Sequence, residues 1–169
     1  MGQSERSNPR PQYESQDDLS NEERAAPAIE YALRGEARKL PKNHFADFAV
    51  VDGKSEIRAF VEYKRRHFRW GDYPTVILSA VKFSKLRGVQ GLRVRAFFVV
   101  EDDGGEIRAL ELTRPDLDFW VEYGGRTFNT RDDMDIEPVV HLQCSQFRRI
   151  ANGDRSKEED GPSSGFSAR

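Results

Sequence analysis

The sequence predicts a mixed α/β fold in which two helices pack against a small sheet. Two stretches carry apolar residues at helical spacing, and several shorter runs have the apolar patterning of strands. Asp-Gly and Gly-Gly pairs separate two pairs of these runs, as in β-hairpins. The resulting order is α-β-β-α-β-β followed by irregular β segments, so we expect an α+β core with extra C-terminal strands.

Length and composition limit the chain to one folded unit. Its 169 residues leave room for one domain with a hydrophobic core. The apolar fraction is only 37%, and the charged fraction is 33%, which predicts disordered ends. We expect a disordered arm over residues 1–21, a folded domain over residues 22–151 and a disordered tail over residues 152–169.

Composition also argues against secreted and membrane classes. No apolar run approaches the roughly eighteen residues that a membrane-spanning helix needs. The first 24 residues hold three apolar side chains, too few for the apolar region of a secretory signal. Cys144 is the single cysteine, which excludes an internal disulfide and a cysteine-based zinc cage. We therefore expect a cytoplasmic protein with no membrane partner.

The first helix is expected over residues 21–39. Asn21 can cap its N-terminus, and the acids Glu22 and Glu23 suit the positive end of the helix dipole. Apolar residues then recur at helical spacing and predict a buried stripe, and Pro41 is expected to end the helix. The stripe consists of Ile29, Leu33, Ala37 and Leu40.

Two strands joined by a tight turn follow this helix. The first, residues 45–51, is apolar except for Asp47, and residues 52–55 begin with the turn-forming pair Asp-Gly. The second covers residues 57–64, and its alternation places Glu62 and Lys64 on the same face.

The second helix is expected over residues 74–87, with Pro74 at its first position. Thr75, Ser79 and Lys82 would form a polar stripe along it, because they are spaced at i, i+4 and i+7. The remaining β segments are expected at residues 92–100, 106–112, 119–130, 138–142 and 147–150, with a hairpin turn at 102–105 and an irregular hairpin around Gly124-Gly125.

The first hairpin contains three candidate catalytic residues, Asp47, Glu62 and Lys64. Adjacent strands lie about 4.8 Å apart, so the hairpin would bring Asp47 near Glu62. Two carboxylates that close raise each other's pKa, and a divalent cation relieves their repulsion. The alternative interpretation is an ordinary cross-strand pair between Asp47 and Lys64, which would contribute about 0.2–1 kcal/mol.

A magnesium ion suits this set of ligands. Mg²⁺ is commonly held by one or two carboxylates together with water and phosphate oxygens, here Asp47 and Glu62. The backbone carbonyl of Tyr63 would add another oxygen ligand. Lys64 is then placed to orient or deprotonate a water, or to neutralise a phosphate. The pattern therefore predicts a Mg²⁺ site for phosphate chemistry, with Mn²⁺ as a substitute.

This arrangement resembles the PD-(D/E)xK nuclease superfamily, whose fold is restriction-endonuclease-like. The matching motifs are Ala46-Asp47 and Glu62-Tyr63-Lys64, and the order α-β-β-α-β over residues 22–100 matches the common core. Ala46 stands where the superfamily name has Pro. A weaker similarity to phage-type members extends over residues 73–82, 125–127 and 136–141. The resemblance implies a Mg²⁺-dependent nuclease with nucleic acid, and first of all DNA, as its substrate.

The resemblance also implies auxiliary residues. Many members place a Glu on the first helix at the metal, which would be Glu30 here, 17 residues before Asp47, with Glu36 as its competitor. Polar residues of the second helix often approach the phosphate, which would be Ser79 and Lys82. Many such enzymes cut both strands as dimers, so a homodimer is an open expectation.

A basic segment interrupts an otherwise acidic chain. Residues 64–95 carry nine basic side chains and one acid, a net charge of +8; the whole chain carries −2, and the rest of it therefore −10. A local cationic surface favours an anionic partner such as nucleic acid. After Lys64, cations alternate with aromatic rings, which suits phosphate contacts combined with base stacking. The candidate phosphate contacts are Arg65, Arg66 and Arg69, with Phe68, Trp70 and Tyr73 as the rings; the alternative is a solvated basic loop whose rings lie in the core.

Two other function classes compete with a nuclease. One is a non-catalytic nucleic-acid-binding or interaction module that keeps the nuclease fold. The other is a structural α+β protein in which the acids and the lysine only form ion pairs. Metal-dependent nicking of plasmid DNA that is lost in Glu62→Ala distinguishes an enzyme from both.

Overall fold

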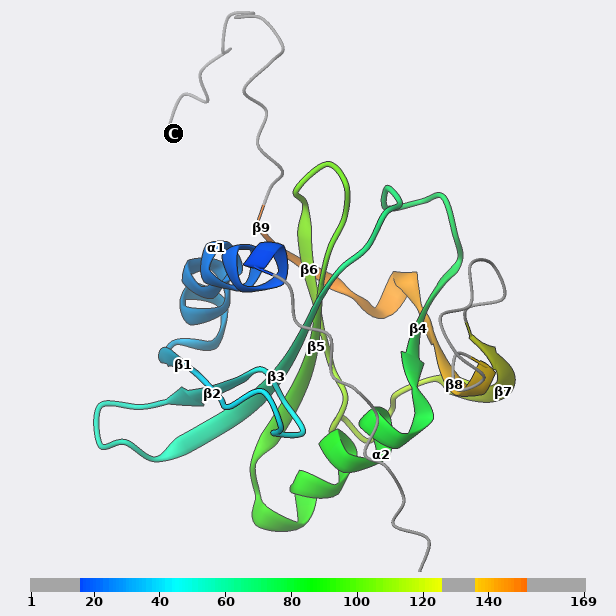
Figure 1. Ribbon diagram of the computed structural model, residues 1–169. Helices are drawn as coiled ribbons and strands as arrows, with labels where there is room; N and C mark the ends of the chain where they lie inside the picture. Colours follow the sequence, from blue (N-terminus) through cyan, green and yellow to red (C-terminus); the bar gives the residue numbers. More distant parts are fainter. Residues whose placement is uncertain (1–15, 126–135, 152–169) are drawn as a thin grey trace, which may run out of the picture.

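Two sheets and two α-helices make up the part of the chain that the computed structural model describes, residues 16–125 and 136–151 (Figure 1). The mixed α+β architecture with C-terminal strands confirms the expected restriction-endonuclease-like fold class. Within those residues no helix is long and apolar enough to cross a membrane. The elements follow in the order α1 (Gln16–Leu33), β1 (Glu36–Lys39), β2 (Phe48–Val51), β3 (Ile57–Arg65), β4 (Thr75–Ser79), α2 (Ala80–Gly88), η1 (Val89–Leu92), β5 (Arg95–Glu101), β6 (Ile107–Glu111), β7 (Phe119–Gly125), β8 (Ile136–Gln143), η3 (Cys144–Gln146) and β9 (Arg148–Ala151).

The larger sheet has six strands in the order β1-β2-β3-β5-β6-β9. Its central pair, β3 and β5, is parallel, and its other neighbours are antiparallel. A parallel pair needs a long crossover connection, which β4, α2 and η1 supply here. The crossover therefore carries α2 to one face of β3.

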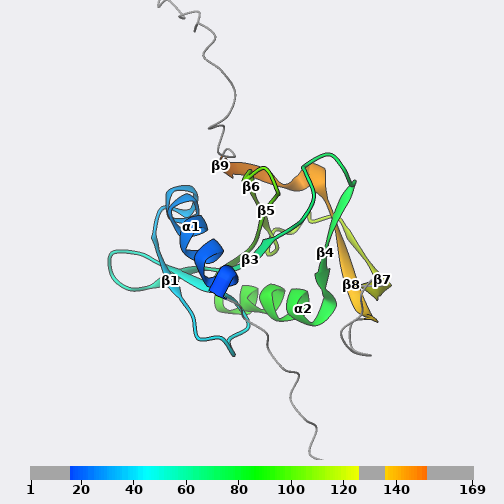
Figure 2. The same cartoon turned by 45° about the horizontal axis from the view of Figure 1, so that its top comes forward.

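The smaller sheet has three antiparallel strands in the order β4-β8-β7. In Figure 2, α1 lies on one side of β3 and β5, and α2 lies with β4, β7 and β8 on the other. The connection between β7 and β8 falls outside the described residues.

The larger sheet separates two hydrophobic cores. Ala25 and Ile29 of α1 pack on one face against β2, β3 and β5, and Phe83 and Leu86 of α2 belong to the core of the other face. Alternation along β3 sends Val61 and Tyr63 toward α1, and Phe60 and its face-sharing neighbour Glu62 toward α2. The candidate site therefore lies on the α2 face.

The first helix differs from the prediction at both ends. It begins at Gln16 and ends at Leu33, after which Arg34 adopts a left-handed φ of 55°. Residues 36–39 then form the edge strand β1 against β2, so Ala37 and Leu40 are not helical and Pro41 does not end the helix. The left-handed Arg34 ends the helix, and residue 35 must be glycine because a Cβ there would come within 2.7 Å of the Val51 carbonyl oxygen.

The first part of the predicted second helix is a strand. Residues 75–79 form β4, and α2 begins only at Ala80. Val76 and Leu78 are buried while their neighbours are half-buried, which is the period of two of a strand rather than the 3.6 of a helix. The predicted polar helix stripe of Thr75, Ser79 and Lys82 was therefore wrong, since only Lys82 lies on α2.

The remaining elements follow the prediction with shifted bounds. The turns at residues 52–55 and 102–105 are both confirmed by hydrogen bonds that close them. Residues 89–92 form a 3₁₀ turn, so the strand expected from residue 92 begins only at Arg95. Of the expected irregular hairpin at residues 119–130, the structure describes β7 up to Gly125, and the rest lies outside the described residues. The expected C-terminal tail also lies outside them, as do residues 1–15 of the expected arm.

Candidate active site

Glu62 is the centre of the site. Its side chain is 0% exposed although it carries an ionisable carboxyl group. Lys64, two positions later on the same face of β3, places Nζ 3.1 Å from Glu62 Oε1. Lys82, from α2, donates a hydrogen bond of 2.9 Å to Glu62 Oε2. One buried carboxylate therefore lies between two lysines that come from different elements.

Asp47 is fixed beside Glu62 by two backbone hydrogen bonds. Its N–H donates to the carbonyl of Val61 at 2.9 Å, and its Oδ2 accepts the N–H of Tyr63 at 2.8 Å. These two bonds reach β3 on either side of Glu62. The first hairpin therefore brings the two acids together, as the sequence predicted.

The charges of this cluster shift one another's pKa. Burial raises the pKa of Glu62, and the neighbouring Asp47 adds to the rise, while Lys64 and Lys82 oppose it. Desolvation alone would lower the pKa of Lys64, but the attraction of Glu62 and Asp47 outweighs it, and the pKa of Lys64 is raised. Burial lowers the pKa of Arg66, with partial compensation by Glu62.

One buried oxygen of the site accepts no hydrogen bond. Glu62 Oε1 has no hydrogen-bond partner among the described residues, although Lys64 lies at ion-pair distance. Buried polar atoms are rarely left in this state, and one that is needs an explanation. No cluster of three or more His, Cys, Asp and Glu side chains is present in residues 16–125 and 136–151, so an all-protein metal cage is absent there. A pair of carboxylates with one unbonded oxygen suits Mg²⁺, which keeps several water ligands.

A family model described as a phage putative PDDEXK endonuclease matches residues 8–150. The chain belongs to this family. The match spans most of the 169 residues and includes the Asp47 and Glu62 motifs. A search of curated proteins found no match to the chain. Membership confirms the resemblance to PD-(D/E)xK nucleases, whose substrate is nucleic acid and which generally use divalent metal ions.

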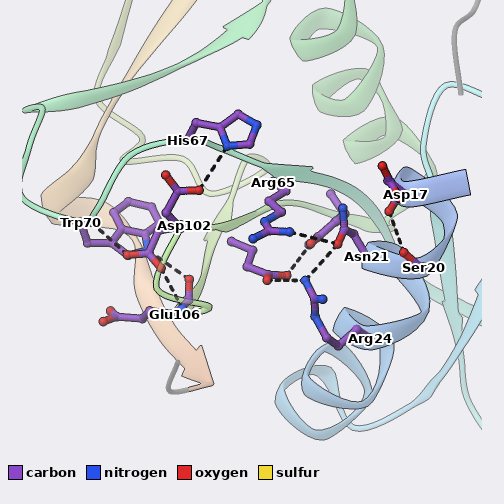
Figure 3. A network of polar contacts seen from close by, with 12 residues as sticks. Asp17, Ser20, Asn21, Arg24, Arg65, His67, Trp70, Asp102 and Glu106 are labelled. Carbon is purple, nitrogen blue, oxygen red and sulfur yellow. Dashed lines mark hydrogen bonds and ion pairs between the residues drawn. The ribbon is translucent and has the colours of Figure 1, made fainter. Parts of the chain in front are cut away.

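Tyr63, between the two family-motif residues of β3, points to the opposite face of the sheet. Its hydroxyl donates to Glu101 Oε2 at 2.5 Å, and Arg24 of α1 pairs with Glu101 Oε1 at 2.6 Å. Figure 3 shows Arg24, Asn21 and Arg65 beside one another in the same network. The network joins α1 to β3 and β5 directly behind the candidate site.

The two candidate helix acids lie away from Glu62. Glu30 is on α1, which packs on the other face of the sheet, and its Oε1 accepts the N–H of Ala37 at 2.9 Å. Glu36 is exposed at the start of β1 and pairs with Arg38, which lowers the pKa of the Glu36 carboxyl. The structure therefore brings neither acid to the carboxylate pair.

The predicted nucleic-acid contacts fall into three places. Lys82 joins the site itself, and Arg66 lies near it while donating to the carbonyl of Ile77 in β4 at 3.0 Å. Arg65, the last residue of β3, is exposed and lies within hydrogen-bond distance of Asn21 of α1, and Arg69 is exposed in the loop after β3. Ser79 donates to Glu137 of β8 at 3.1 Å rather than pointing to the carboxylates.

The rings of the basic loop serve mainly as packing. Phe68 and Trp70 meet edge to face with centroids 5.4 Å apart, and both pack against the core of the α2 face. Trp70 also donates its ring N–H to the carbonyl of Glu106 at 3.3 Å. Tyr73 is 60% exposed and is the ring of this loop that remains accessible for stacking.

Sequence reasoning missed the buried acid Glu101, which is 2% exposed at the end of β5. Its pattern was nonetheless visible, because Glu101 directly follows the apolar strand expected over residues 92–100, just as Asp47 interrupts an apolar run. A charged residue in that context indicates a specific partner, which here is Tyr63 together with Arg24.

Proposed function

We propose that this protein is a metal-dependent endonuclease that hydrolyses phosphodiester bonds of DNA. The observation that carries the proposal is the fully buried carboxylate of Glu62, which has a second acid beside it and the Lys64 ammonium 3.1 Å from its Oε1. We assign Asp47 and Glu62 as metal ligands and Lys64 as the catalytic lysine.

Mg²⁺ would be held by Asp47, Glu62 and the backbone carbonyl of Tyr63, and Mn²⁺ would substitute for it. In a strand the N–H and C=O of one residue point to the same side, so the Tyr63 carbonyl points toward Asp47, which binds the Tyr63 N–H. A bound Mg²⁺ would activate a water and stabilise negative charge on the phosphate. Glu30 is not part of this ligand set, because its carboxylate accepts the backbone N–H of Ala37 in β1.

Asp47 contributes a fixed orientation. Its Oδ2 is held by the Tyr63 N–H, and no hydrogen bond to its Oδ1 is present among the described residues. A carboxylate that is positioned by one oxygen can offer the other to a cation without further ordering.

Lys64 acts as a charged group. The raised pKa keeps its ammonium protonated at neutral pH, which favours orienting a water or stabilising phosphate charge over removing a proton. Its side chain is 44% exposed, so the ammonium is accessible to substrate as well as to Glu62.

Surface cations supply substrate affinity in this proposal. Arg65 is the exposed last residue of the catalytic strand, and Arg69 is exposed in the loop that follows it, so both can contact phosphates of a bound duplex. Phosphate contacts of this kind position the nucleic acid without reading its sequence.

The test is nicking of supercoiled plasmid by the full chain with Mg²⁺, with Mn²⁺ and with EDTA. Glu62→Gln and Asp47→Asn keep side-chain size and should abolish nicking, whereas Glu36→Gln, an exposed acid paired with Arg38, should leave it unchanged. Retained nicking in Glu62→Gln, or nicking that persists in EDTA, would contradict the proposed site. Parallel reactions with single-stranded RNA show whether the protein cleaves DNA, as proposed, or RNA.

A non-catalytic nucleic-acid-binding module is the second candidate. The observation that favours it is the pairing of Glu62 with both Lys64 and Lys82, which neutralises the carboxylate without a metal. This module would bind DNA in a gel-shift assay but would leave plasmid intact under every metal condition.

A further inference from the structure

We propose that Lys82 is an internal counter-ion of Glu62, and that a divalent cation must displace it to bind. This inference rests on the proposed function and adds to it a residue that sets the affinity of the site for metal. Lys82 is thus a positioning residue with two alternative partners, Glu62 before the metal binds and solvent or a phosphate afterwards.

The ion pair between Lys82 and Glu62 can break without disturbing the fold. Lys82 Nζ lies 2.9 Å from Glu62 Oε2, but its side chain is 29% exposed while Glu62 is 0% exposed. Phe83 and Leu86 fix α2 against the core, so the backbone of Lys82 stays in place when its side chain moves. A flexible four-carbon stem can then withdraw the ammonium toward solvent at little structural cost.

Charge makes the displacement necessary. Three cations, Lys64, Lys82 and Arg66, act electrostatically on Glu62, and Asp47 is the acid that acts on it. A divalent cation entering this cluster would meet no net negative charge. Release of one ammonium from the carboxylate restores the charge balance that cation binding requires.

Lys82 is better suited than Lys64 to leave. Lys82 makes a hydrogen bond from a separate element, whereas Lys64 is attached to the same strand as Glu62 only two positions away. A Lys64 ammonium therefore stays near the reacting phosphate whichever way its side chain turns. The displaced Lys82 ammonium is then free to pair with a phosphate, so that metal and nucleic acid reinforce each other's binding.

Mn²⁺ binding to the full chain, measured by the electron paramagnetic resonance of free Mn²⁺ at about pH 8.5, tests the inference. Lys82→Met keeps the length of the side chain and removes the charge, and it should bind Mn²⁺ about tenfold more tightly than the wild type. Lys85→Met is the matched control, because Lys85 is exposed on the same helix about one turn later. The Mn²⁺ affinity of this variant should equal that of the wild type. Thermal denaturation without metal checks folding, and Lys82→Gln replaces Lys82→Met if the latter does not fold.

The outcomes separate this inference from the proposed function. If Glu62→Gln abolishes Mn²⁺ binding but Lys82→Met binds Mn²⁺ no more tightly than the wild type, the counter-ion role is overturned and the metal site stands. If neither the wild type nor Lys82→Met shows Mn²⁺ binding that depends on Glu62, the metal site itself is overturned, and the inference with it. If Lys82→Met and Lys85→Met both bind Mn²⁺ more tightly by the same factor, the loss of one positive charge alone explains the change. That result would also overturn the counter-ion role of Lys82.

Discussion

Asp47 accepts the backbone N–H of Tyr63 with a side-chain oxygen, at 2.8 Å, one residue before β2 begins. A carboxylate thus takes the place that a main-chain carbonyl would occupy if the β2–β3 ladder continued. The same bond ends strand pairing and places a charge beside Glu62. Local structure and site geometry are therefore produced by one interaction.

Asp47→Asn should separate these two roles. The amide oxygen can still accept the Tyr63 N–H, so the free energy of unfolding should change little, whereas Mn²⁺ binding and nicking should be lost. Asp47→Ala removes the acceptor as well and should cost about 1–2 kcal/mol of stability. Urea denaturation of both variants checks this, and equal stability of the two would contradict the structural role.

Glu62 should make stability depend on pH in an unusual direction. Its pKa is raised in the folded state above the usual value of about 4.5, so the folded protein binds this proton more tightly than the unfolded chain. The contribution of Glu62 to stability is then most favourable below about pH 4.5 and is lost as pH rises through the raised pKa. Wild type should therefore gain stability relative to Glu62→Gln on acidification, as measured by urea denaturation at a series of pH values. A difference that stays constant with pH would show that the pKa is not raised.

Arg65 and Arg69 should govern affinity rather than the chemical step. The double variant Arg65→Glu, Arg69→Glu should bind DNA more weakly and with a smaller salt dependence, while single-turnover cleavage at saturating DNA changes less. Arg66 is left intact because its guanidinium bonds the Ile77 carbonyl, and its loss would disturb β4.

A control with the same change in charge is available away from the site. Lys54 is exposed in the β2–β3 turn, and Arg148 is exposed on the edge strand β9. The double variant Lys54→Glu, Arg148→Glu should affect DNA binding less than the double reversal at Arg65 and Arg69. Equal losses would indicate that net charge alone determines affinity.

Tyr63→Phe should affect stability without affecting the metal. The lost hydroxyl donates to Glu101 on the α1 face, and Arg24 remains as a partner for that carboxylate. We expect a loss of about 1 kcal/mol in the free energy of unfolding and an unchanged Mn²⁺ affinity. A large change in Mn²⁺ affinity would show that the network behind β3 also positions the ligands.

Where an element depends on neighbours in sequence, the prediction was confirmed. The Asp-Gly turn at residues 52–55 forms because those residues suit a tight turn wherever they stand. Strand alternation likewise places Glu62 and Lys64 on one face, and a tight hairpin returns β3 alongside Asp47. The acid pair and its lysine were therefore visible in the sequence.

The tertiary structure decided the rest, because partners distant in sequence compete with local propensity. Residues 75–79 have a spacing that suits a helix, but β8 offers them a complete antiparallel partner, and they form β4 instead. The chain leaves α1 at Arg34 and runs so close to Val51 that only a glycine fits at position 35, an approach that no local pattern reveals. Shortening α2 to Ala80–Gly88 places Lys82 in its first turn, where its ammonium reaches Glu62. The sequence by itself thus determined which residues carry the charge, and only the packing of α2 and β4 on the sheet decided that a second lysine shares the buried carboxylate.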